Sequence, residues 1–167
     1  MSGEASVDAA IARMYAEHWI SLLRLAVLLV DDRQSAEDVV QEAFAQLYRR
    51  WDRLDDRGSA LAYLRSTVLN RSRSVLRRRR VARGYIPPVM PPDASAEHAA
   101  VMREDRQEVH RAVSALPTRV REVLVLRYYL DLPHSEIART LGISESTARS
   151  TASRGIALLG QKLKDLR

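Results

Sequence analysis

Residues 134–159 read HSEIARTLGISESTARSTASRGIALL, and this stretch predicts two short helices joined by a tight turn. Apolar residues recur at the three- and four-residue steps of one helix face in its first half. Gly142 follows, where the chain needs a left-handed residue in order to turn. The inward positions of the first helix are expected to be Ile137, Ala138 and Leu141, with Ile143 filling the turn. The spacing is typical of a helix-turn-helix.

The second helix of this motif is expected to begin at a serine cap, either Ser144 or Ser146. Its inward positions are expected to be Ala148, Ala152, Ile156 and Leu159. Its outward positions are expected to be Glu145, Thr147, Arg149, Ser150, Ser153 and Arg154. In a helix-turn-helix the N-terminal part of the second helix enters the DNA major groove, where arginine is the commonest reader of guanine. The alternative is an ordinary helical hairpin with a solvated polar face.

Charge is unevenly distributed along the chain, whose net charge is +6. Residues 61–85 hold eight arginines and no acidic residue, and residues 111–167 are also net basic. Residues 1–60 and 86–110 are net acidic. Two basic blocks separated by acidic ones indicate two places that meet a polyanion such as nucleic acid.

The first basic block coincides with a helix expected from about residue 60 to residue 80. Seven arginines fall within sixteen residues there, and no acid pairs them. Such uncompensated repulsion favours a polyanionic partner, and Asn70 and Ser74 among the arginines could read bases. The alternative is a solvated helix end, because cations also favour the C-terminal end of the helix dipole.

A helix is also expected over about residues 35–51, where Ser35 three residues before Asp38 resembles a capping box. Its apolar stripe is Val39, Val40, Ala43, Phe44, Leu47 and Trp51. Its polar side is mostly acidic and contains Glu37, Asp38, Gln41 and Glu42. This side could be a solvated face. Carboxylates so close together could also suggest a metal or nuclease site, but the four histidines are scattered far from them.

The fold class predicted from these patterns is all-α, because no stretch shows the sustained alternation of a strand. Gly84 to Ala94 contains four prolines, which disfavour helix and mark a boundary between two small helical domains. The expected division is residues 1–80, a linker over 81–104, and residues 105–167. The absence of cysteine excludes disulfides and thiol catalysis. The N-terminus lacks a signal-peptide pattern, and the apolar run over residues 20–30 is too short to span a bilayer.

Several segments resemble the extracytoplasmic-function (ECF) group of sigma factors in the sigma-70 superfamily, and among them the actinobacterial SigE-like group. Residues 35–44 (SAEDVVQEAF) look like the segment that docks on the polymerase clamp helices. Residues 62–78 look like the segment that melts and reads the −10 promoter element. Residues 115–129 resemble the entry to the C-terminal domain, and residues 135–147 resemble the helix-turn-helix that reads the −35 element. The chain departs from the family pattern at Pro133, Ala148, Thr151 and Ala152, and at Ser74.

The resemblance implies a sigma factor that binds core RNA polymerase and directs promoter-specific initiation, without being an enzyme and without a cofactor or metal. The implied partners are the clamp helices of the β′ subunit, the β flap, promoter DNA and, as a further partner that the family allows, an anti-sigma factor. The implied polymerase-binding residues are Glu37, Asp38, Gln41 and Glu42. The implied −10 residues are Tyr63, Asn70, Arg71, Arg73 and Arg77. The implied −35 residues are Ser146, Thr147, Arg149, Ser150, Ser153 and Arg154. The implied location is cytoplasmic, at the nucleoid, with no membrane partner.

Two other readings remain open at this point. A transcriptional regulator could use the same helix-turn-helix without docking on polymerase, although this leaves the match of residues 35–51 unexplained. A recombinase or transposase could use acidic catalytic residues, for which Asp31, Asp32 and Asp38 are the candidates. The absence of an expected sheet argues against this second alternative.

Overall fold

The computed structural model describes residues 2–82 and 98–166, and regular structure within them is helical throughout, with no strand. The all-α prediction is confirmed. The chain divides into two compact units between residues 87 and 88, and each unit is described by itself. The proline-rich part of the expected linker lies outside the described residues. No helix of the described segments combines the length and apolarity needed to cross a bilayer.

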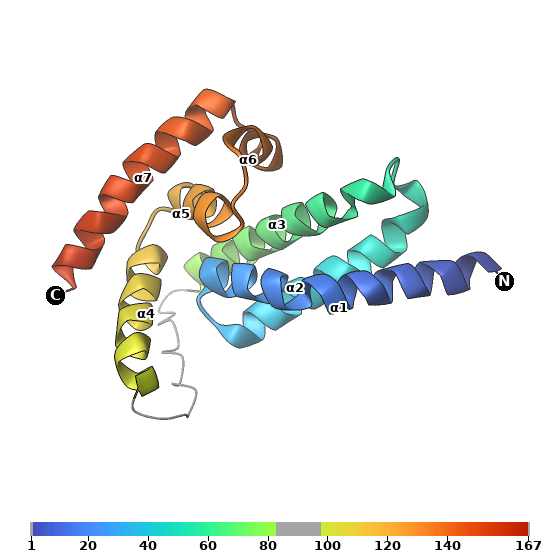
Figure 1. The fold of residues 1–167 in the computed structure, drawn as a ribbon, viewed down its shortest axis with the longest axis horizontal. Coiled ribbons are helices and arrows are strands. Elements are labelled where there is room, and N and C mark those ends of the chain that lie inside the picture. The colour runs from blue at the N-terminus through green and yellow to red at the C-terminus, as the bar shows by residue number, and fades with distance from the viewer. Residues whose placement is uncertain (1, 83–97, 167) are drawn as a thin grey trace. The chain divides into compact units, whose positions relative to one another are not determined.

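The N-terminal unit contains three long helices, α1 (Ser2–Val30), α2 (Arg33–Arg50) and α3 (Ala60–Val81). Each of the three packs against the other two (Figure 1). Their apolar stripes meet in one core, because residues three and four apart share a helix face. Fully buried side chains of this core include Leu22, Leu25, Val30, Val40, Leu47, Leu64, Val68 and Leu69. Each such burial contributes about 1.5–3 kcal/mol, so packing rather than helix propensity fixes these helices.

The turn between α1 and α2 differs from the expected one. Asp31 takes a left-handed conformation (φ 68°), which turns the chain within two residues. Asp32 then caps α2, its carboxylate accepting a hydrogen bond from the backbone N–H of Ser35 at 2.8 Å. The expectation that Ser35 starts the helix was therefore wrong. An aspartate side chain directly before the first turn outcompetes the serine because it already satisfies an amide left open at the helix start.

The connection between α2 and α3 contains two short 3-10 turns, η1 (Trp51–Arg53) and η2 (Arg57–Ser59). Trp51 closes the apolar stripe of α2 and is buried. Asp56 caps the second turn by accepting from the backbone N–H of Gly58 at 2.8 Å. This connection between α2 and α3 therefore consists of two short turns, the second of them capped by Asp56, that lead into α3.

The C-terminal unit contains α4 (His98–Ser114), α5 (Thr118–Leu124), α6 (His134–Leu141) and α7 (Glu145–Asp165). A π-helical turn, η3 (Val125–Tyr129), continues α5, with the N–H of Leu130 bonded to the carbonyl of Val125 at 3.2 Å. α4 begins at His98, inside the stretch taken from sequence as linker. α5 has Pro117 at its N-cap, which offers no side-chain cap, and begins at Thr118.

The inward face of α7 consists of small residues. Ala148, Thr151, Ala152 and Gly155 are its buried positions. A Cβ on Gly155 would lie 2.9 Å from Val120 Cγ1 and 3.1 Å from Leu124 Cδ2, so α5 and α7 approach closely there. Ala148 and Ala152 face inward as expected. Ile156, also expected to face inward, is 44% exposed, and the other buried positions, Thr151 and Gly155, were not among those expected.

Candidate nucleic-acid interface

The helix-turn-helix of the C-terminal unit is formed by α6, a turn over Gly142, Ile143 and Ser144, and α7. Gly142 takes the left-handed conformation (φ 65°, ψ 38°) that the sequence predicted for this position. The N–H of Ile143 bonds to the carbonyl of Ala138 at 3.0 Å, which closes the end of α6. Of the two serines proposed as the cap of α7, Ser144 caps it, its hydroxyl accepting from the N–H of Thr147 at 3.1 Å.

One face of the first three turns of α7 carries the polar side chains expected to read DNA. This recognition face consists of Ser146, Thr147, Arg149, Ser150, Ser153 and Arg154, all of which are exposed. Arg149 pairs with Glu145 at 3.0 Å across one turn, and both side chains are more than half exposed. Exposed pairs of this kind are weak, so Arg149 can exchange Glu145 for another acceptor at little cost.

A second polar face lies on α3. Tyr63, Asn70 and Arg77 are spaced by seven residues and therefore share one side of the helix. Asn70 and Arg77 are exposed, and Arg73 donates from Nη1 to Oδ1 of Asn70 at 3.2 Å. The guanidinium of Arg50 lies 5.9 Å from the ring centre of Tyr63. We call Tyr63, Asn70, Arg73 and Arg77 the α3 outer face.

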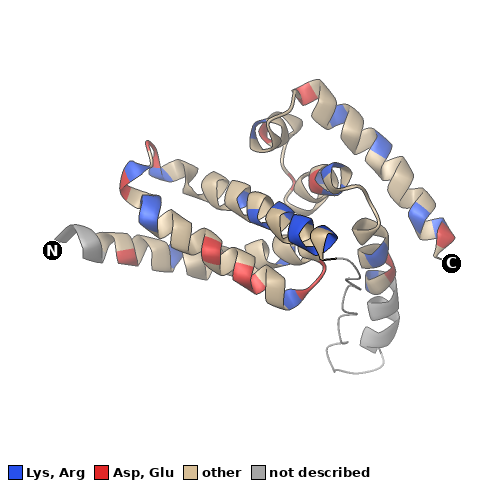
Figure 2. Cartoon of the chain, turned by 180° about the vertical axis from the view of Figure 1, so that it is seen from behind, with Lys and Arg blue, Asp and Glu red and all other residues tan. Residues whose placement is uncertain are grey.

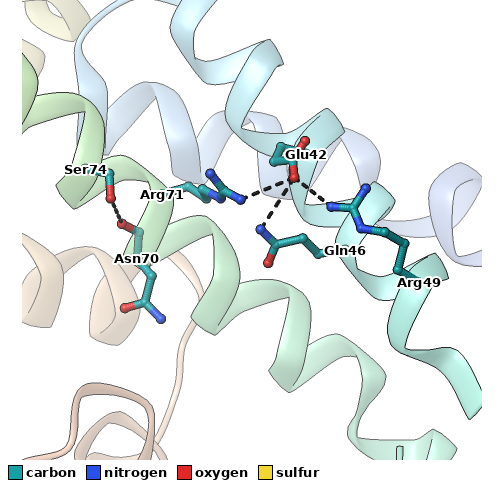
Figure 3. Close-up of polar contacts among 6 residues, drawn as sticks. All are labelled: Glu42, Gln46, Arg49, Asn70, Arg71 and Ser74. Atoms are coloured by element: carbon teal, nitrogen blue, oxygen red, sulfur yellow. Dashed lines mark hydrogen bonds and ion pairs between the residues drawn. The ribbon is translucent and has the colours of Figure 1, made fainter. Parts of the chain in front are cut away.

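Arg71 does not belong to this outer face. Its guanidinium turns toward α2 and donates from Nη2 to Oε1 of Glu42 at 3.2 Å. The same oxygen accepts from Arg49 at 2.8 Å and from Gln46 at 3.5 Å, and we call these four residues the Glu42 cluster. Figure 3 shows Arg71 directed at Glu42, while the side chain of Asn70 points away from it. The hydrogen bond from Arg49 foremost, then the one from Gln46 and the positive charges of Arg49 and Arg71, hold the pKa of Glu42 below its ordinary value of 4.5.

Arg79 is a second arginine that turns inward. Its guanidinium donates to the carbonyl of Val30, to the carboxylate of Asp32 and to Oγ of Ser35. The side chains of Arg79 and Asp32 are only 16% and 13% exposed. Arg79 thus ties the end of α3 to the turn between α1 and α2. The sequence alone could not show that Arg79 turns inward, because its neighbours Arg77, Arg78 and Arg80 are also arginines and are exposed.

The polar side of α2, which we call the α2 polar face, is formed by Glu37, Asp38, Gln41 and Glu42. Asp38 and Gln41 are exposed, and Glu37 and Glu42 are partly exposed. Arg33 pairs with Glu37 at 2.8 Å, and Gln34 donates to Asp38 at 3.2 Å. In Figure 2 acidic residues colour the middle of α2, whereas basic residues gather on the last turns of α3. The N-terminal unit therefore presents an acidic and a basic surface on two different helices.

The acids proposed for a catalytic site do not converge. The carboxylate of Asp32 is taken up by Ser35 and Arg79, while Asp38 lies on the exposed side of α2. Within residues 2–82 and 98–166, no group of three or more acidic, histidine or cysteine side chains could hold a metal ion. The described geometry thus offers the recombinase alternative no support.

Two helical units, one with a helix-turn-helix and both with exposed arginines, define the chain as a two-domain DNA-binding protein. The family model of sigma-70 region 2 matches residues 14–81, and that of sigma-70 region 4 matches residues 106–159. The RNA polymerase sigma-E factor of Streptomyces avermitilis is 34% identical over 144 residues, which cover 86% of this chain and 79% of the relative. The ECF RNA polymerase sigma factor SigL of Mycobacterium tuberculosis is 31% identical over 173 residues, which cover 99% of this chain and 96% of the relative.

Solved structures show the same fold. The sigma factor RpoE of Bartonella quintana, crystallised with the anti-sigma factor NepR, has a TM-score of 0.72 at 22% identity and covers 93% of this chain and 99% of its own. CnrH in complex with the cytosolic domain of CnrY has a TM-score of 0.71 at 22% identity, and the match covers 97% of this chain and 95% of the CnrH chain.

The chain belongs to the ECF sigma factors of the sigma-70 family. It acts with RNA polymerase to direct promoter-specific initiation of transcription. The alternative of a regulator that does not engage polymerase is not favoured, because both sigma regions match in one chain in the expected order. Sigma factors as a class are non-enzymatic regulators of transcription.

Proposed function

We propose that the α2 polar face docks on the β′ clamp helices of core polymerase, that the α3 outer face reads the −10 element, and that the recognition face of α7 reads the −35 element. The observation that carries this assignment is the separation of charge within the N-terminal unit. Because the acidic and basic surfaces lie on different helices, polymerase and DNA can be engaged by one small unit at once.

The chemistry of each surface fits its proposed partner. Exposed carboxylates and amides on a rigid helix suit a basic protein surface, with specificity set by complementary charge. Asn70 can pair with the edge of a base, and Arg77 can meet phosphate. On α7, a bidentate contact from Arg149 to guanine would discriminate by about 1–3 kcal/mol, whereas Arg154, further along the helix, suits phosphate.

The remaining partners follow from the family. The C-terminal unit is proposed to contact the β flap, and the chain is proposed to act in the cytoplasm at the nucleoid without catalytic activity of its own. An anti-sigma factor is proposed as a further partner, because the sigma factor RpoE was crystallised with the anti-sigma factor NepR, and CnrH, which has the same fold, forms a complex with the cytosolic domain of CnrY.

Charge reversal on α2 tests the docking assignment. We expect Asp38→Arg with Glu42→Arg to lose co-purification with core polymerase and run-off transcription, while far-UV circular dichroism stays unchanged. The matched control is Asp52→Arg with Asp55→Arg, which makes the same charge change at exposed positions between α2 and α3. Normal co-purification of the α2 variant, or equal loss in the control, would rule out docking through this face.

A further inference from the structure

The Glu42 cluster joins two residues that were assigned to different partners. Glu42 was expected to meet polymerase, and Arg71 was expected to meet −10 DNA. In the structure they meet each other, 29 positions apart in sequence, at 3.2 Å (Figure 3). Neither assignment can be fulfilled fully while this pair persists.

Three side chains of the cluster donate to one oxygen of the Glu42 carboxylate. Oε1 accepts from Arg49, Gln46 and Arg71, which exceeds the about two lone-pair sites of one oxygen. If the Gln46 amide is turned over, its oxygen accepts from Nε of Arg71 at 3.0 Å instead, and Oε1 of Glu42 keeps the bonds from Arg49 and Arg71. In either orientation, a cation from polymerase that approached this oxygen would compete with Arg71.

We propose that Glu42 is a shared acceptor that couples polymerase docking to promoter reading: it holds Arg71 against α2 in the free chain and releases it when polymerase takes its place. The inference rests on the proposed function of the α2 polar face. Asn70 and Arg77 are exposed, whereas the ion pair between Arg71 and Glu42 must break before Arg71 meets DNA.

The coupling works in both directions. A partner that draws Glu42 away from Arg71 makes Arg71 available to phosphate, and DNA that draws Arg71 away must raise the affinity of Glu42 for polymerase by the same factor. The side chains of Glu42 and Arg71 are 40% and 43% exposed, so the pair is screened by solvent. Exposed pairs limit the gain in affinity to about fivefold. A bias of this size favours DNA binding by the assembled complex without blocking the free chain.

Removal of the negative charge tests the masking step without polymerase. The full chain is titrated with a labelled single-stranded oligonucleotide of mixed sequence over a series of salt concentrations. We expect Glu42→Gln to bind it up to about fivefold more tightly than the parent. The salt slope should steepen by about 0.7, which corresponds to one more phosphate neutralised on a single strand.

Two variants separate masking from general charge or folding effects. Glu17→Gln makes the same charge change on α1, where the carboxylate lies 3.7 Å from Nε2 of its neighbour His18, and should leave the salt slope unchanged. Adding Arg71→Gln to Glu42→Gln should return the slope to that of the parent. An equal gain in Glu17→Gln, or a gain that survives Arg71→Gln, would overturn the proposal.

The polymerase step has its own outcome. If charge reversal on α2 leaves co-purification intact, the docking assignment fails and the release by polymerase fails with it, although the oligonucleotide titration still reports the masking. If docking through α2 holds but Glu42→Gln binds DNA like Glu17→Gln, only the coupling fails. The two failures are thus read from different measurements.

Discussion

Arg77 and Arg79 lie two residues apart in the arginine run of α3 and have different surroundings. Arg77 is exposed on the outer face, whereas Arg79 is bonded to Val30, Asp32 and Ser35. We expect Arg79→Met to lower the free energy of unfolding by about 2 kcal/mol, because it leaves Asp32 partly buried without its cation. Arg77→Ala should leave stability within about 0.5 kcal/mol of the parent.

The two variants should have the opposite effects on DNA binding, which Arg77→Ala should weaken and Arg79→Met should not. On duplex DNA, Arg77→Ala should reduce the salt slope by about 0.9, because one phosphate contact is lost. Arg79→Met should leave the slope unchanged wherever the variant is folded. A reduced slope for Arg79→Met would show that Arg79 leaves Asp32 in order to meet phosphate.

Asp32 makes stability depend on pH. Burial of its carboxylate raises the pKa, but hydrogen bonds from Ser35 and Arg79 outweigh burial and hold the pKa below the ordinary value of 3.8. The unfolded chain therefore binds the proton more tightly, and the stability that Asp32 contributes is present above 3.8 and lost as the pH falls through the lower pKa of the folded state.

Asp32→Asn should therefore be less stable than the parent at neutral pH, and the difference should shrink as the pH falls from about 5 through the acid range. Denaturant unfolding over a pH series measures this difference. Asp55→Asn, at an exposed position, is the control, and the difference between its free energy of unfolding and that of the parent should not change with pH. A difference for Asp32→Asn that stays constant with pH would contradict the assignment of Asp32 as a paired carboxylate.

At the scale of a single element, α7 offers a matched pair of glycines. A Cβ on Gly155 would lie 2.9 Å from the stiff side chain of Val120, whereas a Cβ on Gly160 would meet nothing within 4 Å. Gly160→Ala should raise the free energy of unfolding by about 0.5–1 kcal/mol through helix propensity. Gly155→Ala should instead lower it by about 1–3 kcal/mol, because overpacking pushes α5 away from α7. Thermal unfolding of both variants measures this, and stabilisation by Gly155→Ala would show that the contact yields freely.

Elements with a strong sequence signal could be predicted, and their details depended on contacts that sequence does not show. The turn at Gly142 was predictable because few residues other than glycine tolerate its backbone conformation. The cap of α2 was assigned wrongly because Asp32 and Ser35 are both preferred N-cap residue types, and only the structure shows that Asp32 bonds the open amide. On the inward face of α7, Ala148 and Ala152 were predicted, but Gly155 was missed because it gives no hydrophobic signal, although α5 approaches closely there.

The π-helical turn η3 was also beyond sequence reasoning. The turn covers Val125 to Tyr129 and includes Tyr128, which is 62% exposed. Nothing in the residue types marks such a turn. Likewise, the sequence placed Arg71 with the DNA-binding set because the pairing with Glu42 arises only when α2 and α3 pack.

For the whole molecule, the two basic blocks of the sequence fall in two units that are separately compact. Each unit carries its own proposed contacts to DNA, on α3 in one and on α7 in the other. The free energy of promoter binding should then be the sum of two largely independent contributions, one from each unit, while polymerase holds both units to one DNA molecule. This organisation predicts which pairs of substitutions couple and which do not.

Arg77→Ala and Arg149→Ala should therefore have additive effects on the free energy of promoter binding by the complex with polymerase, within about 0.5 kcal/mol, because the residues lie in different units. Asn70→Ala and Arg73→Ala are the contrasting pair, since these side chains contact each other at 3.2 Å and their effects should not add.

Arg77→Ala and Arg149→Ala should also differ in how they change the preference among promoters. Arg77→Ala should weaken all promoters alike, whereas Arg149→Ala should relax the preference at one −35 position by about 1–3 kcal/mol. Binding measured on a panel of promoters mutated at single −35 positions distinguishes these effects. Strong coupling between Arg77 and Arg149 would mean that the two units read the promoter as one rigid surface, and an unchanged −35 preference for Arg149→Ala would remove that residue from base reading.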